Sequence, residues 1–327
     1  MKKWFPISLA ITAGVSTIAI VSALSIRHYK VEKAKKNEVP IAKKEYLENN
    51  KFINKMLLDI FKDKELAEKY VNFENSISNQ QFDELKYSLN FFPIFRNNVS
   101  NFDNAKIIAS LKKNIVNTLT ENWFWYLNNI SKFIFVFNPY GDDYKLLDKE
   151  EELLEKVKSI FPDISLKLTN NKIIDFYESD YKTMPEVKKY NEWTDIKNIY
   201  YFYKHNIVIK GFTYQYKNKI NVIIRPSLLY FNNSKSIEET KKQIDKLDNL
   251  IFEKRSQYIK NEYKYEEQYF SNFNASEFYK KNNDTQMLTL FNDNGYNQSY
   301  YEASAELSSN EKNKIEIFRF SWRDIND

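Results

Sequence analysis

The chain has 327 residues, of which 43% are hydrophobic and 17% aromatic, and its formal net charge is +5. It contains no cysteine and two histidines. Disulfide frameworks, thiolate metal sites and cysteine nucleophiles are therefore excluded. The apolar content is sufficient for a sizeable core, in one large domain or two ordinary ones.

Basic charge is concentrated at the N-terminus, where residues 1–45 carry nine Lys or Arg against three Glu. The remainder of the chain is close to neutral, whereas a nucleic-acid-binding domain carries a basic face. Much of the Lys, Asn and aromatic content reflects A/T-rich codons. We therefore expect no nucleic-acid partner.

The first element is an uncharged segment from Trp4 to Ile26 that contains Pro6 and Gly14. As a helix rising about 1.5 Å per residue it would cover roughly 34 Å, enough to cross a bilayer. A retained membrane anchor and a signal peptide cleaved after Ala23 are both open. The basic residues that follow favour the anchor.

The orientation of this segment is ambiguous. Lys2 and Lys3 precede it, but seven Lys or Arg lie in residues 27–44. The positive-inside rule would place the C-terminal part in the cytoplasm. Residues 27–45 are charged and poor in large apolar side chains, so we expect a solvated stalk there.

Helical spacing of apolar residues begins after residue 46, at positions 53, 56, 57, 60 and 61. Further helices are predicted over residues 64–89, from Asp103 to about 119, and over 146–160. A long helix is predicted from Ser236 to Phe270. Ile or Tyr recurs every seven residues along this helix, but the second heptad position that a coiled coil fills with apolar residues is mostly polar. The helix is therefore expected to pack on a core and not to form a coiled coil.

Strands are predicted where β-branched and aromatic residues gather: 133–137, 196–203, 207–216, 220–230 and 315–322. Polar breaks at 204–206 and 217–219 indicate hairpins of an antiparallel meander. Residues 271–313 are expected to form long loops. The order predicts an α+β fold: an N-terminal transmembrane helix (1–26), the stalk, and one domain (46–327) in which a helical bundle packs with the meander.

Four large aromatic residues follow one another at Trp123, Phe124, Trp125 and Tyr126. Consecutive side chains point in different directions on a helix or a strand, so they cannot all face one surface. Either the segment is enclosed by two packing layers, or some rings form a binding platform for a partner.

This motif carries a resemblance to a known family. The run Asn122–Leu127, the following Lys132-Phe133 and the earlier Leu89–Phe95 resemble the aromatic-motif membrane proteins of mycoplasmas, the aromatic-cluster surface proteins. The resemblance covers the anchor and residues 46–140, and more loosely 200–210. It implies a membrane-anchored, outward-facing domain and no catalytic residues.

Signals for catalysis are weak, and no catalytic, cofactor or metal site is predicted. Common phosphate-binding, hydrolase and metalloprotease motifs do not occur. Gly141-Asp142-Asp143 is interpreted as a turn. Asp175 and Glu178 could share a helix face as an acid–base pair, and His205 is expected in a surface hairpin turn.

The sequence therefore predicts a non-enzymatic, single-pass protein of the cell membrane whose C-terminal domain is extracellular and binds a partner. The expected partners are the lipid bilayer and a host or envelope protein, or a glycan. Two alternatives remain: a membrane-tethered subunit of a cytoplasmic-side complex, and a carboxylate-dependent hydrolase.

Overall fold

The computed structural model describes residues 50–76, 84–85, 87–88, 102–137, 172–290, 295–309 and 315–322. All of them belong to a compact unit that begins at Pro40. The apolar segment 4–26, the stalk and the helix predicted over 146–160 lie outside the described residues. Among the described helices, none has the length and apolar character needed to cross a membrane. The N-terminal transmembrane helix thus stays a prediction.

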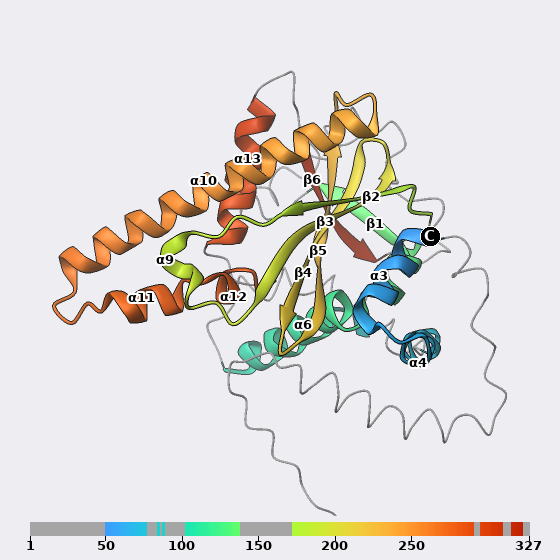
Figure 1. Ribbon diagram of the computed structural model, residues 1–327, viewed down its shortest axis with the longest axis horizontal. Helices are drawn as coiled ribbons and strands as arrows, with labels where there is room; N and C mark the ends of the chain where they lie inside the picture. Colours follow the sequence, from blue (N-terminus) through green and yellow to red (C-terminus); the bar gives the residue numbers. More distant parts are fainter. Residues whose placement is uncertain are drawn as a thin grey trace, which may run out of the picture. The chain divides into compact units, whose positions relative to one another are not determined.

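One antiparallel sheet of six described strands, in the order β1-β6-β5-β4-β3-β2, organises this unit (Figure 1). The predicted α+β class and the β3–β4–β5 meander are confirmed. β2, which sequence reasoning missed, extends the meander at one edge. The strands are β1 (Phe133–Phe137), β2 (Asp175–Asp180), β3 (Thr194–Lys204), β4 (Ile207–Tyr216), β5 (Lys219–Phe231) and β6 (Ile315–Trp322).

The hairpin between β4 and β5 has the geometry that the polar break predicted. Tyr216 pairs with Lys219, so the loop has two residues, Lys217 and Asn218. Both have positive φ, 49° and 62°. Such a turn matches the right-handed twist of the flanking strands.

A bulge interrupts the pairing of β4 with β5. Between the pairs Ile209–Leu228 and Gly211–Ile224, one residue of β4 lies opposite three of β5. Pro226 is one of these three residues. Proline has no N–H to donate to a sheet ladder, so a bulge is where an inner strand tolerates it.

Helices pack against both faces of the sheet. On one face lie α10 (Ile237–Tyr269) and α13 (Tyr296–Ser309), which contact each other. Tyr200 of β3 donates a hydrogen bond to Asp248 of α10. Its neighbour Tyr201 points to the opposite helix layer, where burial and the charge of Asp59 raise the pKa of its hydroxyl. Both tyrosines are completely buried, because a strand covered on both sides buries successive residues.

The second helix layer contains α3 (Lys51–Phe61), α4 (Lys64–Asn75), α6 (Phe102–Thr120) and α7 (Trp123–Asn128). α3, α6 and α7 contact β5. The predicted stripe of α3 is confirmed, since Ile53, Met56 and Leu57 are buried. The helix predicted from Asp103 is α6, which begins one residue earlier, at Phe102. Asp63 caps α4 by accepting a hydrogen bond of 2.8 Å from the Glu65 amide.

The prediction of long loops over 271–313 is wrong. Three helices lie there: α11 (Ala275–Lys281), α12 (Asp284–Met287) and α13. Asn274 and Asn283 cap α11 and α12 by accepting hydrogen bonds from amides of the first turn. The Asn residues that suggested loops therefore begin helices. The remaining short elements are η1 (Ile130–Lys132) and α9 (Pro185–Lys188).

Candidate binding pocket beside helix α10

The predicted aromatic cluster lies in the core. Trp123, Phe124, Trp125 and Tyr126 form most of α7, and their exposed fractions are 4%, 1%, 7% and 0%. Trp125 and Tyr126 both contact the ring of Phe133 edge to face. This agrees with the first interpretation, a segment enclosed by packing layers. A binding role for the four residues stays a prediction.

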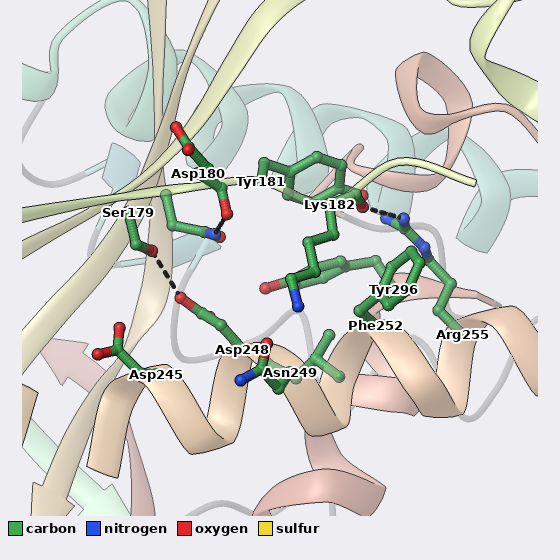
Figure 2. Close-up of a pocket in the computed structure, with 12 residues that line it drawn as sticks. Ser179, Asp180, Tyr181, Lys182, Asp245, Asp248, Asn249, Phe252, Arg255 and Tyr296 are labelled. Carbon is green, nitrogen blue, oxygen red and sulfur yellow. Dashed lines mark hydrogen bonds between the residues drawn. The ribbon is translucent and has the colours of Figure 1, made fainter. Parts of the chain in front are cut away.

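A pocket of about 250 Å³ lies between the end of β2 and α10 (Figure 2). From the first side come Ser179 and Asp180 of β2 and the two residues that follow, Tyr181 and Lys182. Figure 2 shows Lys182 extending into the pocket toward α10. Tyr296 of α13 and Asn198 of β3 complete the lining near the sheet.

The helical side of the pocket follows from the spacing along α10. Asp245, Asp248, Asn249 and Phe252 occupy positions i, i+3, i+4 and i+7 and line the pocket together. Residues with this spacing share one face of a helix. Ser236 fixes the start of the helix by accepting a hydrogen bond from the Glu239 amide.

Asp248 is held by a buried cation. The amine of Lys210, whose side chain is completely buried, lies 2.7 Å from an Asp248 carboxylate oxygen. It also donates to Asn198 at 3.0 Å and contacts the Tyr200 hydroxyl. Ser179 donates to the other Asp248 oxygen at 2.9 Å. Burial lowers the pKa of Lys210, and the Asp248 carboxylate opposes this shift.

A second ion pair closes the far end of the pocket. Arg255 and Asp284 are both 1% exposed and lie 2.9 Å apart. Tyr181 and Asn191 each donate a hydrogen bond of 2.9 Å to Asp284. Arg255 also donates to the Lys182 carbonyl at 2.6 Å. This network ties α10 and α12 to the segment that follows β2, so it fixes the backbone from which Lys182 extends.

Two buried donors of the lining have no hydrogen-bond partner within the described part of the chain. They are the hydroxyl of Tyr296, a residue that is 1% exposed, and Nε of Arg255. The guanidinium of the buried Arg225 lies beside the stacked rings of Tyr296 and Tyr300, 5.6 and 5.7 Å from their centroids. Buried polar groups are normally paired, so these two donors are exceptions in the wall of the pocket.

The structure separates the predicted acid–base pair. Asp175 and Glu178 lie on the strand β2, not on a helix. Residues three apart on a strand point to opposite faces, so the two carboxylates do not act together. His205 lies exposed in the β3–β4 turn as predicted. Gly141-Asp142-Asp143 lies outside the described residues. Within the described residues, no cluster of side chains suited to a metal ion occurs.

A second exposed feature lies at the far end of α10. Tyr265, Tyr269 and Phe270, here called the aromatic tip, have exposed fractions of 54%, 64% and 54%. They are the most exposed large hydrophobic residues of the described part of the chain. The ring centroids of Tyr265 and Tyr269 lie 4.9 Å apart. In Figure 1 this end of α10 extends beyond the sheet before the chain returns through α11.

The fold and the aromatic core define an α+β domain built around a central aromatic segment. Residues 29–239 match the family described as aromatic cluster surface protein. The chain therefore belongs to this family, as the Trp-Phe-Trp motif predicted. Toward the C-terminus the match reaches farther than predicted, since it includes the β-meander and the first residues of α10. It begins at residue 29, so it does not include the predicted anchor. No curated protein and no solved structure matches the chain.

Proposed function

We propose that the protein is anchored in the cell membrane by residues 4–26, displays its α+β domain outward, and binds a partner protein through the aromatic tip. The family description supports a surface location. The exposure of the three aromatic rings is the observation that carries the binding role. Exposed aromatic residues of this kind are typical anchors of protein interfaces.

The tip is held by packing behind it. Tyr263 contacts the rings of Phe273, Phe278 and Tyr279, with centroids 4.9 to 5.4 Å away. Phe278 is buried. The hairpin of α10 and α11 therefore has a small aromatic core of its own, and the tip residues project from a fixed support. A preformed contact surface of this kind loses less conformational entropy on binding.

Charge around the tip favours a protein over a lipid surface. Glu262, Glu266 and Glu267 lie on the same two turns as Lys260 and Lys264, so the local balance is slightly acidic. Binding to anionic lipid requires an excess of basic residues. The tip lacks such an excess, whereas mixed charges around aromatic anchors are typical of the polar rim of a protein interface.

Location and contact can be tested together, because the chain has no cysteine and accepts single reporter thiols. We would introduce Tyr269→Cys in the tip and, as a matched control, Leu66→Cys on α4, which is 48% exposed. Labelling by a membrane-impermeant maleimide is measured on intact cells and on purified protein. We expect Leu66→Cys to react equally in both, and Tyr269→Cys to react several-fold more slowly on cells.

Equal reactivity of Tyr269→Cys in both settings would refute a bound partner at the tip. Failure of both thiols to react until the cells are permeabilised would refute the outward orientation. It would support the alternative of a subunit of a cytoplasmic-side complex, which the basic residues in 27–44 favour. The two parts of the proposal therefore fail separately.

The carboxylates of the pocket support binding in preference to hydrolysis. Asp180, Asp245 and Asp248 all line it, as a carboxylate-dependent hydrolase would require. A general acid needs a raised pKa. The hydrogen bond from Lys197 instead lowers the pKa of Asp180, and Lys210, Ser179 and Tyr200 hold Asp248. We therefore propose no catalytic role for these acids.

A further inference from the structure

The aromatic tip continues a row of side chains that is buried along the first half of α10. Ile244 and Ile251 of this row are 0% and 3% exposed and belong to the core. Tyr258, seven residues farther on, is half-buried against the core. Tyr265, the next member of the row, is 54% exposed. The far end of this face is therefore composed like a packing surface, but little of the described part of the chain covers it.

Two glutamates lie on the same face as the tyrosines of the tip. Glu262 precedes Tyr265 by three residues, and both are neighbours on the helix surface at this spacing. Glu266 precedes Tyr269 by the same interval. Both glutamates are half-buried. Burial, and then the charges of Glu262 and Glu266, raise the pKa of Tyr258, so both carboxylates lie near the aromatic row.

No described cation neutralises this face. Lys260 and Lys264 each precede a tyrosine of the tip by five residues, which is a rotation of about 140° around the helix. Among the described residues, no Lys or Arg lies over the ring of Tyr265, Tyr269 or Phe270. The two glutamates of the face form no ion pair there either. The tip therefore presents tyrosine rings and carboxylates without a cation.

Elsewhere in the domain the same two groups hold a cation. Two buried basic side chains each contact a tyrosine ring and a carboxylate: Lys210 with Tyr200 and Asp248, and Arg255 with Tyr181 and Asp284. The cation lies 4.3 Å from the ring centroid and 2.7 Å from the carboxylate oxygen in the first case. The corresponding distances are 4.7 and 2.9 Å in the second. The face of an aromatic ring and a carboxylate both attract a cation, so the tip offers the chemistry of these two sites to a molecule outside the chain.

We propose that the aromatic tip binds an Arg or Lys side chain of the partner protein. The cation lies over the rings of Tyr265 and Tyr269. Its charge pairs with Glu262 or Glu266, which gives a half-buried carboxylate the ion pair that it lacks. Phe270 excludes water from the contact, and a cation is held more strongly by aromatic rings when it is desolvated. The inference rests on the proposed binding of a partner at the tip and adds that the partner's contact surface is basic.

A test on cells keeps all three rings and reports on the partner through Gln268→Cys, an exposed position next to Tyr269. We expect this thiol to react with a membrane-impermeant maleimide several-fold more slowly on intact cells than in the purified protein. Adding Glu262→Gln and Glu266→Gln should remove this protection. Adding Glu253→Gln, exposed on α10 outside the tip, is the matched control and should leave the protection unchanged.

A test on the purified full chain, in non-ionic detergent micelles, uses a defined cation. A short peptide with four arginines is titrated by calorimetry and compared with the same peptide containing citrulline, which has the shape of arginine without the charge. We expect the arginine peptide to bind roughly tenfold more tightly. Tyr265→Leu with Tyr269→Leu, which keeps apolar surface but removes the rings, should abolish this preference, and so should Glu262→Gln with Glu266→Gln. Circular dichroism verifies that each variant is folded.

The outcomes separate this inference from the proposed function. Protection of Gln268→Cys that persists after Glu262→Gln and Glu266→Gln would overturn the basic partner but leave partner binding standing. Equal reactivity of Gln268→Cys on cells and in the purified protein would refute partner binding itself. Equal binding of the arginine and citrulline peptides would also overturn the inference. Binding to phosphatidylcholine vesicles that depends on the same tyrosines and glutamates would overturn it in favour of a choline headgroup.

Discussion

Replacement of Lys210 by methionine tests the buried ion pair on which the pocket wall rests. The substitution keeps a long side chain but removes the cation that lies 2.7 Å from Asp248. Removing one partner of a buried pair costs about 3–5 kcal/mol, because the other charge stays buried. The Asp248 side chain is 12% exposed and keeps donors from Ser179 and Tyr200. We therefore expect the lower limit, about 3 kcal/mol.

Urea unfolding followed by far-ultraviolet circular dichroism measures this loss. With a slope of about 3 kcal/mol per molar urea, the midpoint of Lys210→Met should fall by about 1 M. The double variant Lys210→Met with Asp248→Leu should recover most of the loss, since an apolar pair replaces the ion pair. Lys197→Met, which removes an exposed pair on the neighbouring strand, should leave the midpoint unchanged. A single variant as stable as the parent, or additive losses in the double variant, would refute the reasoning.

Three further predictions concern the core, the buried tyrosines and the anchor. Trp125→Ala should reduce the free energy of unfolding by about 3–5 kcal/mol, whereas Tyr269→Ala in the aromatic tip should not change the melting temperature. If the Trp125 variant instead melts as the parent does but loses partner binding, Trp125 is a contact residue. Burial raises the pKa values of Tyr126 and Tyr201 above the ordinary 10.0, so the folded state binds more protons than the unfolded state above pH 10. Stability should therefore be lost as the pH rises beyond 10, and a melting temperature that is constant or rises between pH 10 and 11.5 would contradict this. Deletion of residues 1–26 should release the domain from the membrane fraction, and persistent fractionation with membranes would point to a second attachment.

The elements that were predicted correctly from the sequence each have one dominant periodicity of apolar residues. The strands of the meander are rich in aromatic and β-branched residues, and α10 has a regular apolar stripe, so local pattern and tertiary packing agree. β2 was missed because its sequence, Asp175–Asp180, is mostly polar and none of its residues is fully buried. Its side chains reach α10 through hydrogen bonds, from Tyr177 to Asp245 and from Ser179 to Asp248. The helices after residue 271 were missed because Asn-rich composition indicates loops as readily as helix caps.

The pocket was not predicted, because its parts are far apart in the sequence. Asp245 and Asp248 resemble the solvated face of an amphipathic helix until β2 and β3 are placed against them. Lys210 carried a usable signal, since it interrupts the apolar run Ile207–Ile209 in a strand that is buried on both faces. A lysine in such a strand must find a buried anion. The Lys-rich composition of the chain hid this exception.

The order of strands has a consequence for how the protein is made. β1 pairs with β6, from Phe133 opposite Trp322 to Phe137 opposite Phe318, so β1 finds its partner only after the other five strands have been synthesised. Such non-local pairing slows folding, because a long loop must close before the contact forms. The sheet is complete only when β6 has left the ribosome. A premature stop codon just before β6 would leave both β1 and the outer edge of β5 unpaired, two open strand edges that promote aggregation.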